Sequence, residues 1–139
     1  MNNLEKAIEL LKDSGYTFVA VGGGEVITST ERGVKPLLEI LDRGKNLHKF
    51  SVADKVVGKA AAFLYVLLEP SEICTDVISR PALEVLENNG INIKYKTLTE
   101  AILNRTHTGF CPMETAVKNT SEAVTALSLI HEKLRQLNN

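Results

Sequence analysis

The beginning of the chain carries two patterns of apolar side chains, one with the period of a helix and one with the period of a strand. Residues 4–11 place apolar side chains at the i, i+3, i+4 and i+7 positions of an amphipathic helix, and Gly15 follows its expected end. YTFVAV at residues 16–21 and EVITST at residues 25–30 are typical of strands. Gly22–Gly24 lies between them and tolerates the positive φ of a tight turn, so this region predicts a β-hairpin.

The rest of the chain predicts alternating helices and strands. Residues 34–41 predict a second helix with Pro36 in its first turn, and residues 55–68, apolar on nearly all sides, predict a central buried helix. Thr97 and Glu100 have the spacing of a capping box, which predicts a short helix after them. The remaining predicted elements are a strand at 73–78, a helix at 81–86, a strand at 91–95 and a helix at 123–134.

This order of elements predicts the fold class. Strands that alternate with helices after an opening hairpin indicate an α/β protein with a mixed sheet covered on both faces, and the hairpin forms the antiparallel edge. A fifth strand is expected near Gly109-Phe110. No Pro-, Gly- or Ser-rich linker divides the chain, so we expect residues 1–139 to form a single domain.

The composition is that of an ordinary globular protein, and it argues against two classes of partner. Of the 139 residues, 44% are hydrophobic and 24% are charged, and the formal net charge is −1. Such a balance provides no broad attraction for nucleic acid or for a membrane surface, so we expect neither as a partner. The most apolar stretch, residues 56–68, contains Lys59 and is shorter than the roughly 20 residues that cross a bilayer.

The cysteines and the first residues bear on the location of the protein. Cys74 and Cys111 are its two cysteines, too few for a disulfide framework. The opening MNNLEKAIELLKDSG carries charges throughout, unlike a secretory signal. We therefore expect a cytoplasmic protein whose thiols stay reduced.

The stretch ADKVVGKAAA at residues 53–62 contains Gly58-Lys59, the pair found in phosphate-binding loops. A Walker-type loop requires G-x-x-x-x-G-K-[ST]. Here Ala53 stands at the position of the first glycine, and Ala60 stands at the position of the hydroxyl that holds magnesium. The sequence therefore argues against a Walker-type nucleotide site.

The same stretch predicts an anion site at the start of a helix. We expect Asp54 to cap that helix, with Lys55 and Lys59 at i and i+4 on one face. Cations at a helix N-terminus oppose the macrodipole, so two lysines there suit a bound anion. Gly58 would let a ligand approach the backbone closely. The alternative is that both lysines are solvated and Asp54 is only a cap.

A second candidate site is TGFCPMET at residues 108–115. Pro112 suits the first position of a helix, and a thiol directly before it, that of Cys111, can be nucleophilic there. His107 lies four residues upstream of Cys111. The alternative is a small buried cysteine, the usual role of a free thiol. Glu114 either contacts a ligand or favours the helix N-terminus by its charge.

The remaining candidates for ligand contacts are scattered along the chain. The Cys and His residues form no C-x-x-C or H-x-x-x-H pair, so we expect no metal site and no cofactor. Arg32 lies in a predicted turn and either reaches a phosphate or carboxylate or remains an exposed loop residue. The candidate metal ligands are Cys74, Cys111, His48, His107 and His131.

Four stretches taken together point to a known family. They are ERGVKPLLEIL at 31–41, ADKVVGKAAA at 53–62, SRPALEVL at 79–86 and GFCPMETAV at 109–117. With them the chain resembles an uncharacterised prokaryotic family, a domain of unknown function placed in the cytidine deaminase-like superfamily. The resemblance covers nearly the whole chain and implies a three-layer α/β/α fold with an antiparallel edge strand on a five-stranded mixed sheet.

The zinc chemistry of that superfamily is not implied for this chain. Zinc deaminases begin one central helix with His or Cys, any residue, then Glu, and the next helix with Pro-Cys-x-x-Cys. If these helix starts correspond, Gly58, Ala82 and Val85 stand where the zinc ligands would be. Ala60 then stands in place of the proton-transferring Glu. Pro81 alone remains, and it also suits an ordinary helix start.

The sequence thus predicts a deaminase-like domain without zinc that binds an anionic small molecule, such as a nucleotide or a nucleotide sugar. One alternative is an enzyme of another type, with Asp54 or Glu114 as acid or base, or Cys111 as nucleophile. Another is a structural or regulatory subunit of an oligomer. The resemblance also implies assembly, so we expect a homo-oligomer. The expected ligand-binding residues are Asp54, Lys55, Gly58, Lys59, Cys111 and Glu114.

Overall fold

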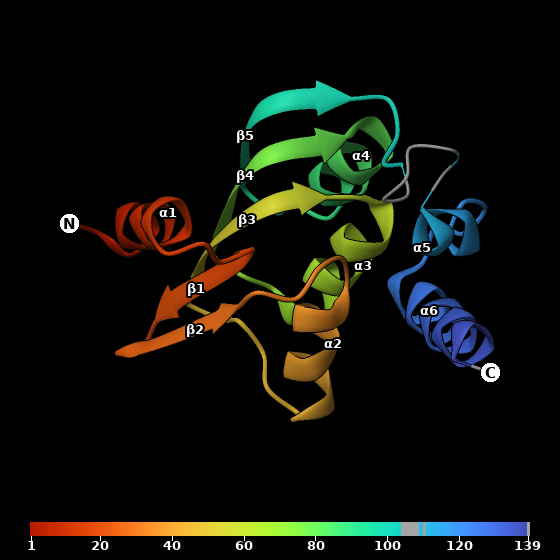
Figure 1. Cartoon of the computed structure of the whole chain (residues 1–139), viewed down its shortest axis with the longest axis horizontal. Coiled ribbons are helices and arrows are strands. Elements are labelled where there is room, and N and C mark those ends of the chain that lie inside the picture. Colours follow the sequence, from red (N-terminus) through yellow and green to blue (C-terminus); the bar gives the residue numbers. More distant parts are fainter. Residues whose placement is uncertain (104–108, 110, 139) are drawn as a thin grey trace.

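A five-stranded mixed sheet forms the centre of the fold in the computed structural model, which describes residues 1–103, 109 and 111–138 (Figure 1). The strands are β1 (Phe18–Gly22), β2 (Glu25–Ser29), β3 (Ser51–Val57), β4 (Glu72–Ser79) and β5 (Ile93–Thr99). Their order across the sheet is β2-β1-β3-β4-β5. β1 runs antiparallel to both β2 and β3, whereas β3, β4 and β5 are parallel.

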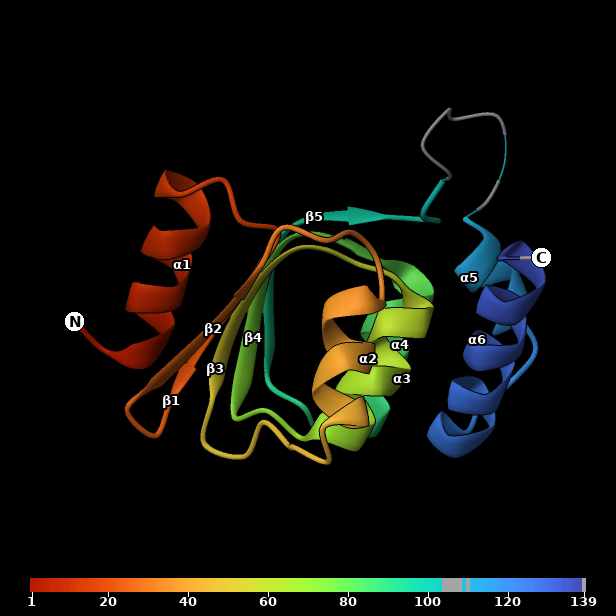
Figure 2. The same cartoon turned by 60° about the horizontal axis from the view of Figure 1, so that its bottom comes forward.

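Helices cover both faces of this sheet. They are α1 (Asn3–Asp13), α2 (Lys35–Asp42), α3 (Lys59–Leu68), α4 (Arg80–Asn88), α5 (Pro112–Ala116) and α6 (Ala123–Leu137). Figure 2 shows α1 on one face, α2, α3 and α4 on the other, and α6 beyond α3. The predicted α/β class and three-layer α/β/α fold, with an antiparallel hairpin at one edge, are therefore confirmed.

α3 is buried on all sides because it lies between the sheet and α6. Phe63, Leu64 and Tyr65 are each at most 1% exposed. From the other side, Ala126 and Ile130 of α6 join the same core cluster. An apolar surface around the whole helix is what such a position requires, so the predicted central helix is confirmed from Lys59 onwards.

α1 is held to the opposite face by a second, smaller core. Ala7 and Leu11 of α1 pack with Val19, Val21 and Ala53 of the sheet. Every residue of β1 is buried, because β1 is covered by helices on both faces and flanked by strands on both edges. β1 therefore provides a rigid neighbour for β3, the strand that carries the candidate site.

The predicted β-hairpin is confirmed, and its turn is Gly23-Gly24. Both residues have positive φ, 57° and 77°, as a two-residue hairpin turn requires. Gly22 has a different role, because a Cβ on it would lie 2.5 Å from the carbonyl oxygen of Lys49 and 2.8 Å from the Cα of Phe50. The end of β1 can approach this backbone only without a side chain.

The prediction of one helix over residues 55–68 is wrong in its first part. Residues 51–57 form β3, which pairs with β1 on one side and β4 on the other. Val52, Val56 and Val57 favour a strand, and two neighbouring strands satisfy its backbone. The helix begins only at Lys59, after Gly58 at the N-cap position.

The capping box at Thr97 and Glu100 is also wrong. β5 continues through Thr97, which pairs with Val77, to Thr99. The fifth strand of the sheet is β3 rather than a segment near Gly109-Phe110, and Phe110 lies outside the described residues.

Candidate functional site

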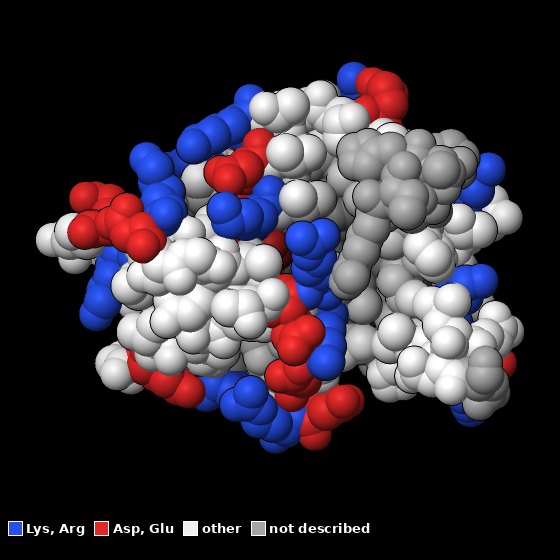
Figure 3. Space-filling view, in the orientation of Figure 1, with Lys and Arg blue, Asp and Glu red and all other residues white. Residues whose placement is uncertain are grey.

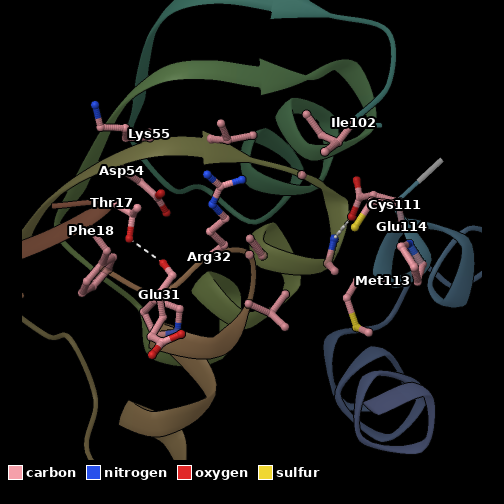
Figure 4. A pocket seen from close by; sticks show the side chains of 18 of the residues that line it. Thr17, Phe18, Glu31, Arg32, Asp54, Lys55, Ile102, Cys111, Met113 and Glu114 are labelled. Carbon is pink, nitrogen blue, oxygen red and sulfur yellow. Dashed lines mark hydrogen bonds between the residues drawn. The ribbon is translucent and has the colours of Figure 1, made fainter. Parts of the chain in front are cut away.

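A pocket of about 750 Å³ opens beside the C-terminal end of β3 (Figure 4). Its walls come mainly from the loop at 31–34, the end of β3, the start of α3, and two later stretches at 102–103 and 111–114. In open α/β sheets, ligands bind beyond the carboxyl ends of the strands. The charged residues along its walls are Glu31, Arg32, Asp54, Lys55 and Glu114.

Charges of both signs occur on the face that contains this region. Figure 3 shows acidic and basic side chains next to one another across the middle of the molecule. The face therefore presents no uniform basic surface of the kind that follows a nucleic-acid backbone.

Asp54 lies in the middle of β3 rather than at a helix start, so its predicted role as a helix cap is wrong. It pairs with Phe18 of β1 and Thr75 of β4, and its carboxyl accepts a hydrogen bond of 2.5 Å from the Tyr65 hydroxyl. Burial raises the pKa of Asp54 to about 7, although the Tyr65 hydrogen bond and neighbouring peptide N–H groups lower it. The side chain still borders the pocket, so this carboxyl can reach a ligand.

Tyr65 was not among the predicted site residues. It is fully buried on α3, and burial raises its pKa well above the ordinary value, so it is a neutral hydrogen-bond donor. A signal was present in the sequence. Within AAAFLYVLL, residues 60–68, the Tyr65 hydroxyl is the polar side-chain group of an otherwise apolar run, and a buried tyrosine requires a partner. Asp54 is the acidic residue of the neighbouring apolar strand.

Lys55 and Lys59 do not share a helix face, contrary to the prediction. Lys55 is exposed on β3, where its peptide N–H donates to Thr17 at 3.1 Å. Arg32 is exposed in the loop before α2 and its side chain borders the pocket. Among the residues that the structure describes, neither Arg32 nor Lys55 forms an ion pair.

The N-terminus of α3 holds the carboxylate of Glu114. The peptide N–H groups of Lys59 and Ala60 donate to its two oxygens at 2.6 and 2.8 Å. A Cβ on Gly58 would lie 2.6–2.9 Å from the same carboxyl group, so the absence of a side chain at position 58 makes this contact possible. Burial raises the pKa of Glu114, while the two hydrogen bonds and Lys59 lower it. The predicted anion position is thus filled by the protein itself.

Lys59 is engaged beside this contact. Its ammonium donates to the carbonyl oxygen of Lys118 at 3.0 Å and lies 5.7 Å from the centre of the Phe63 ring. A second cavity, of about 180 Å³, borders Lys59, Ser79 and Lys118. Glu114 lines both cavities and therefore separates them.

Cys111 lies where the sequence predicts, directly before α5 and its Pro112. It is partly buried, lines the large pocket, and donates its peptide N–H to Ile102 at 3.1 Å. His107, proposed from the sequence as its neighbour, lies outside the described residues. Cys74 is on β4, where burial raises its pKa.

The described part of the chain contains neither a cluster of candidate metal ligands nor a helix that could span a membrane. Across residues 1–103, 109 and 111–138, no group of three or more His, Cys, Asp or Glu side chains is placed to hold a metal ion. In the same part of the chain, no helix has the length and apolar character needed to span a bilayer.

Comparisons with known proteins identify a family and a similar solved structure. The model of a domain of unknown function, DUF1893, matches residues 6–134. The chain is similar to a DUF1893 family protein from Thermotoga maritima of known crystal structure, with a TM-score of 0.85 and 29% identity. That similarity covers 97% of this chain and 90% of the other. The comparison with curated proteins finds no match.

Proposed function

The chain belongs to the DUF1893 family, and we propose that it binds an anionic small molecule, such as a nucleotide or a nucleotide sugar, in the pocket beside β3. The observation that carries the proposal is the pocket itself. Its volume of about 750 Å³ lies within the roughly 300–1,000 Å³ of small-molecule sites. Of the residues expected from the sequence, Asp54, Lys55, Gly58, Cys111 and Glu114 line it, and Lys59 lines the smaller cavity.

The anionic part of the ligand would bind at Arg32. Its side chain is exposed at the pocket and has no carboxylate partner among the described residues. A guanidinium group binds phosphate or carboxylate through two parallel hydrogen bonds. The N-terminus of α3 is not available in this state, because Glu114 occupies it.

The uncharged part of the ligand would pack on the apolar wall. Val34 and Pro36 of the α2 region and Ile102 and Met113 of the later stretches contribute apolar side chains to the lining. Apolar walls with a few polar groups that fix orientation are typical of small-molecule sites.

The placement of this family in the cytidine deaminase-like superfamily is part of the proposal. The mixed sheet with its antiparallel β1–β2 hairpin supports it, and so do helices α3 and α4, which follow neighbouring parallel strands. In this placement the large pocket and the smaller cavity occupy the region of the former active site, at the starts of these two helices.

The direct test is titration calorimetry with the four ribonucleoside 5′-monophosphates, their nucleosides and UDP-glucose. We expect at least one phosphorylated compound to bind more tightly than its nucleoside. Arg32→Ala should then weaken its binding about tenfold or more. Arg43→Ala is the matched control, because Arg43 is exposed at the other end of α2. No binding of any phosphorylated compound at about 1 mM would overturn the proposal.

A second candidate function is catalysis with Asp54 as acid or base. The observation in its favour is the Asp54 carboxyl at the pocket wall, held by the Tyr65 hydroxyl at 2.5 Å. Burial raises the pKa of Asp54 to about 7, and proton transfer at neutral pH is most efficient near that value. Incubation with the tightest-binding compound, followed by NMR, should then show turnover that Asp54→Asn abolishes. An unchanged compound after prolonged incubation would leave binding alone.

We also propose that the protein forms a homo-oligomer and is located in the cytoplasm. Exposed apolar side chains on α6, Val124 at 69% and Leu137 at 55%, support a homo-oligomer. The free thiols of Cys74 and Cys111 support a reducing cytoplasmic environment. Sedimentation analysis of the purified protein tests the homo-oligomer, and a monomer at all concentrations would reject it.

A further inference from the structure

We propose that the ligand of this pocket carries an N–H or ammonium donor that binds the Asp54 carboxylate, and that Tyr65 is the positioning residue that holds this carboxylate toward the ligand. The inference rests on the proposed function and narrows its ligand class. The ligand would be a molecule with an anionic group at one end and a nitrogen-borne hydrogen-bond donor at the other.

The Asp54–Tyr65 pair is built from two rigid elements. Asp54 is fixed in β3 by pairing with strands on both sides, and Tyr65 is fixed in the most buried helix of the fold. The Tyr65 hydroxyl donates to Oδ2 of Asp54 at 2.5 Å. Tyr65 does not line the pocket, whereas Asp54 does, so the hydroxyl holds the carboxyl from behind. An ionised carboxyl accepts about four hydrogen bonds, which leaves capacity on the pocket side.

Charged groups around Asp54 leave its negative charge poorly compensated. Asp76 on β4 adds repulsion, and no lysine or arginine of the described residues lies within ion-pair distance of Asp54. Figure 4 shows the Arg32 guanidinium and the Asp54 carboxyl both directed into the pocket. The titratable groups on the surrounding elements are Tyr65 on α3, Asp76 on β4, Lys55 on β3, Glu31 and Arg32 before α2, and Glu114 on α5.

A donor on the ligand would add a further partner to the carboxylate. The Tyr65 hydroxyl and neighbouring peptide N–H groups already act on Asp54, and a charge-assisted N–H···O hydrogen bond from the ligand would offset more of the cost of its burial. A ligand with acidic groups alone would meet repulsion from Asp54 and Glu114, both of which line the pocket. The pocket should therefore bind ligands that carry the donor more tightly than ligands that lack it, and Arg32 recognises the anionic end.

This arrangement makes binding depend on pH in a defined direction. A donor binds the ionised carboxylate, so affinity should rise as pH increases through the pKa of Asp54, about 7, and then level off. The Tyr65 hydrogen bond lowers that pKa. Tyr65→Phe should therefore move the rise in affinity to higher pH while leaving the plateau in place, a result that a purely structural role of Tyr65 would not give.

The test compares two pairs of probes that differ in one donor. 5′-AMP is compared with purine riboside 5′-monophosphate, which lacks the amino group, and 5′-UMP with its N3-methyl derivative. Both members of a pair carry the same phosphate, so its titration does not affect the difference in affinity between them. For the pair whose parent binds more tightly, we expect loss of the donor to weaken binding about tenfold or more at alkaline pH. Asp54→Asn should abolish the pH dependence of the difference in affinity between the two members of the pair.

The outcomes separate this inference from the proposed function. Binding that requires Arg32 but is unchanged by loss of the donor and by Asp54→Asn would overturn the inference and leave the proposed function standing. No binding of any nucleotide would overturn both. Circular dichroism of Tyr65→Phe and Asp54→Asn confirms that each variant is folded before binding is measured.

Discussion

Replacing Asp54 with asparagine should stabilise the fold above neutral pH, and this gain should shrink as pH falls from about 7 toward 3.8. Burial raises the pKa of Asp54 from 3.8 to about 7. Asparagine has nearly the same shape, carries no charge, and can still accept the hydrogen bond from the Tyr65 hydroxyl. The substitution therefore removes a half-buried negative charge and keeps the packing around α3.

The size of the effect follows from the pKa. One pKa unit corresponds to about 1.4 kcal/mol, so the rise from 3.8 to about 7 sets an upper limit of about 4 kcal/mol. Because Asp54 borders the pocket, water there reduces the penalty, and we expect about 1–3 kcal/mol. The native state binds this proton more tightly than the unfolded state. The contribution of Asp54 to stability is therefore greatest below pH 3.8 and is lost as pH rises to about 7.

Urea denaturation of both proteins at about pH 5 and about pH 8.5 measures this difference. The asparagine variant should gain stability at both pH values, but by only about a third as much at the lower pH, because about pH 5 lies roughly a third of the way from 3.8 to about 7. Other titrating groups are common to both proteins, so their effects cancel in the comparison.

The matched control is Asp76→Asn on the neighbouring strand β4. Asp76 lies 3.7 Å from the Lys96 ammonium, and its side chain is 46% exposed. An exposed ion pair contributes about 0.2–1 kcal/mol, so the change should be small at both pH values. The raised pKa of Asp54 would be refuted if Asp54→Asn changed the free energy of unfolding by the same amount at both pH values. It would also be refuted if the variant were less stable than the parent protein at about pH 8.5.

Three further predictions concern the glycines and Lys59. Gly58→Ala should displace the Glu114 carboxylate and destabilise the fold by about 1–3 kcal/mol. It should have a smaller effect after Glu114→Ala, and additive losses in the four-protein cycle by urea denaturation would contradict the contact. Gly22→Ala should destabilise by about 3 kcal/mol or more, because backbone atoms block its Cβ, against about 1 kcal/mol for Gly23→Ala in open space. Equal losses of unfolding free energy at 22 and 23 would reject that reasoning. Lys59→Ala should change stability by less than about 1 kcal/mol, and a larger loss by the same assay would show a stronger contact than the one to Lys118.

The local patterns of the sequence were sufficient for most of the fold. Helical periodicity at residues 4–11 and the glycines at 22–24 predicted α1 and the β1–β2 hairpin, because both elements are decided by neighbouring residues. β3 was missed because its apolar residues run directly into those of α3. Periodicity alone does not divide a strand from a buried helix in such a run, and Gly58 is the residue that divides them.

The site was only partly accessible from the sequence for a different reason. Asp54 and Glu114, predicted from the sequence as ligand-binding residues, both line the pocket, yet their partners come from tertiary contacts. The Asp54–Tyr65 hydrogen bond joins a strand to the middle of a helix, and the Glu114 contact joins α3 to residues more than fifty positions later. Local rules carry no information about such pairs, although a lone tyrosine in an apolar helix and a lone carboxylate in an apolar strand both require partners.

The contact between Glu114 and α3 also determines which basic residue should be substituted to test ligand binding. Free N–H groups at the start of a buried helix need an acceptor, and a position without a side chain, Gly58, lets a carboxylate reach them. That reasoning holds, but the acceptor is supplied by α5, and the Lys59 ammonium is engaged with the Lys118 carbonyl oxygen. An external anion at this helix would have to displace a carboxylate held by two hydrogen bonds. Arg32 has no such competitor among the described residues, and it is therefore the cation whose removal tests ligand binding.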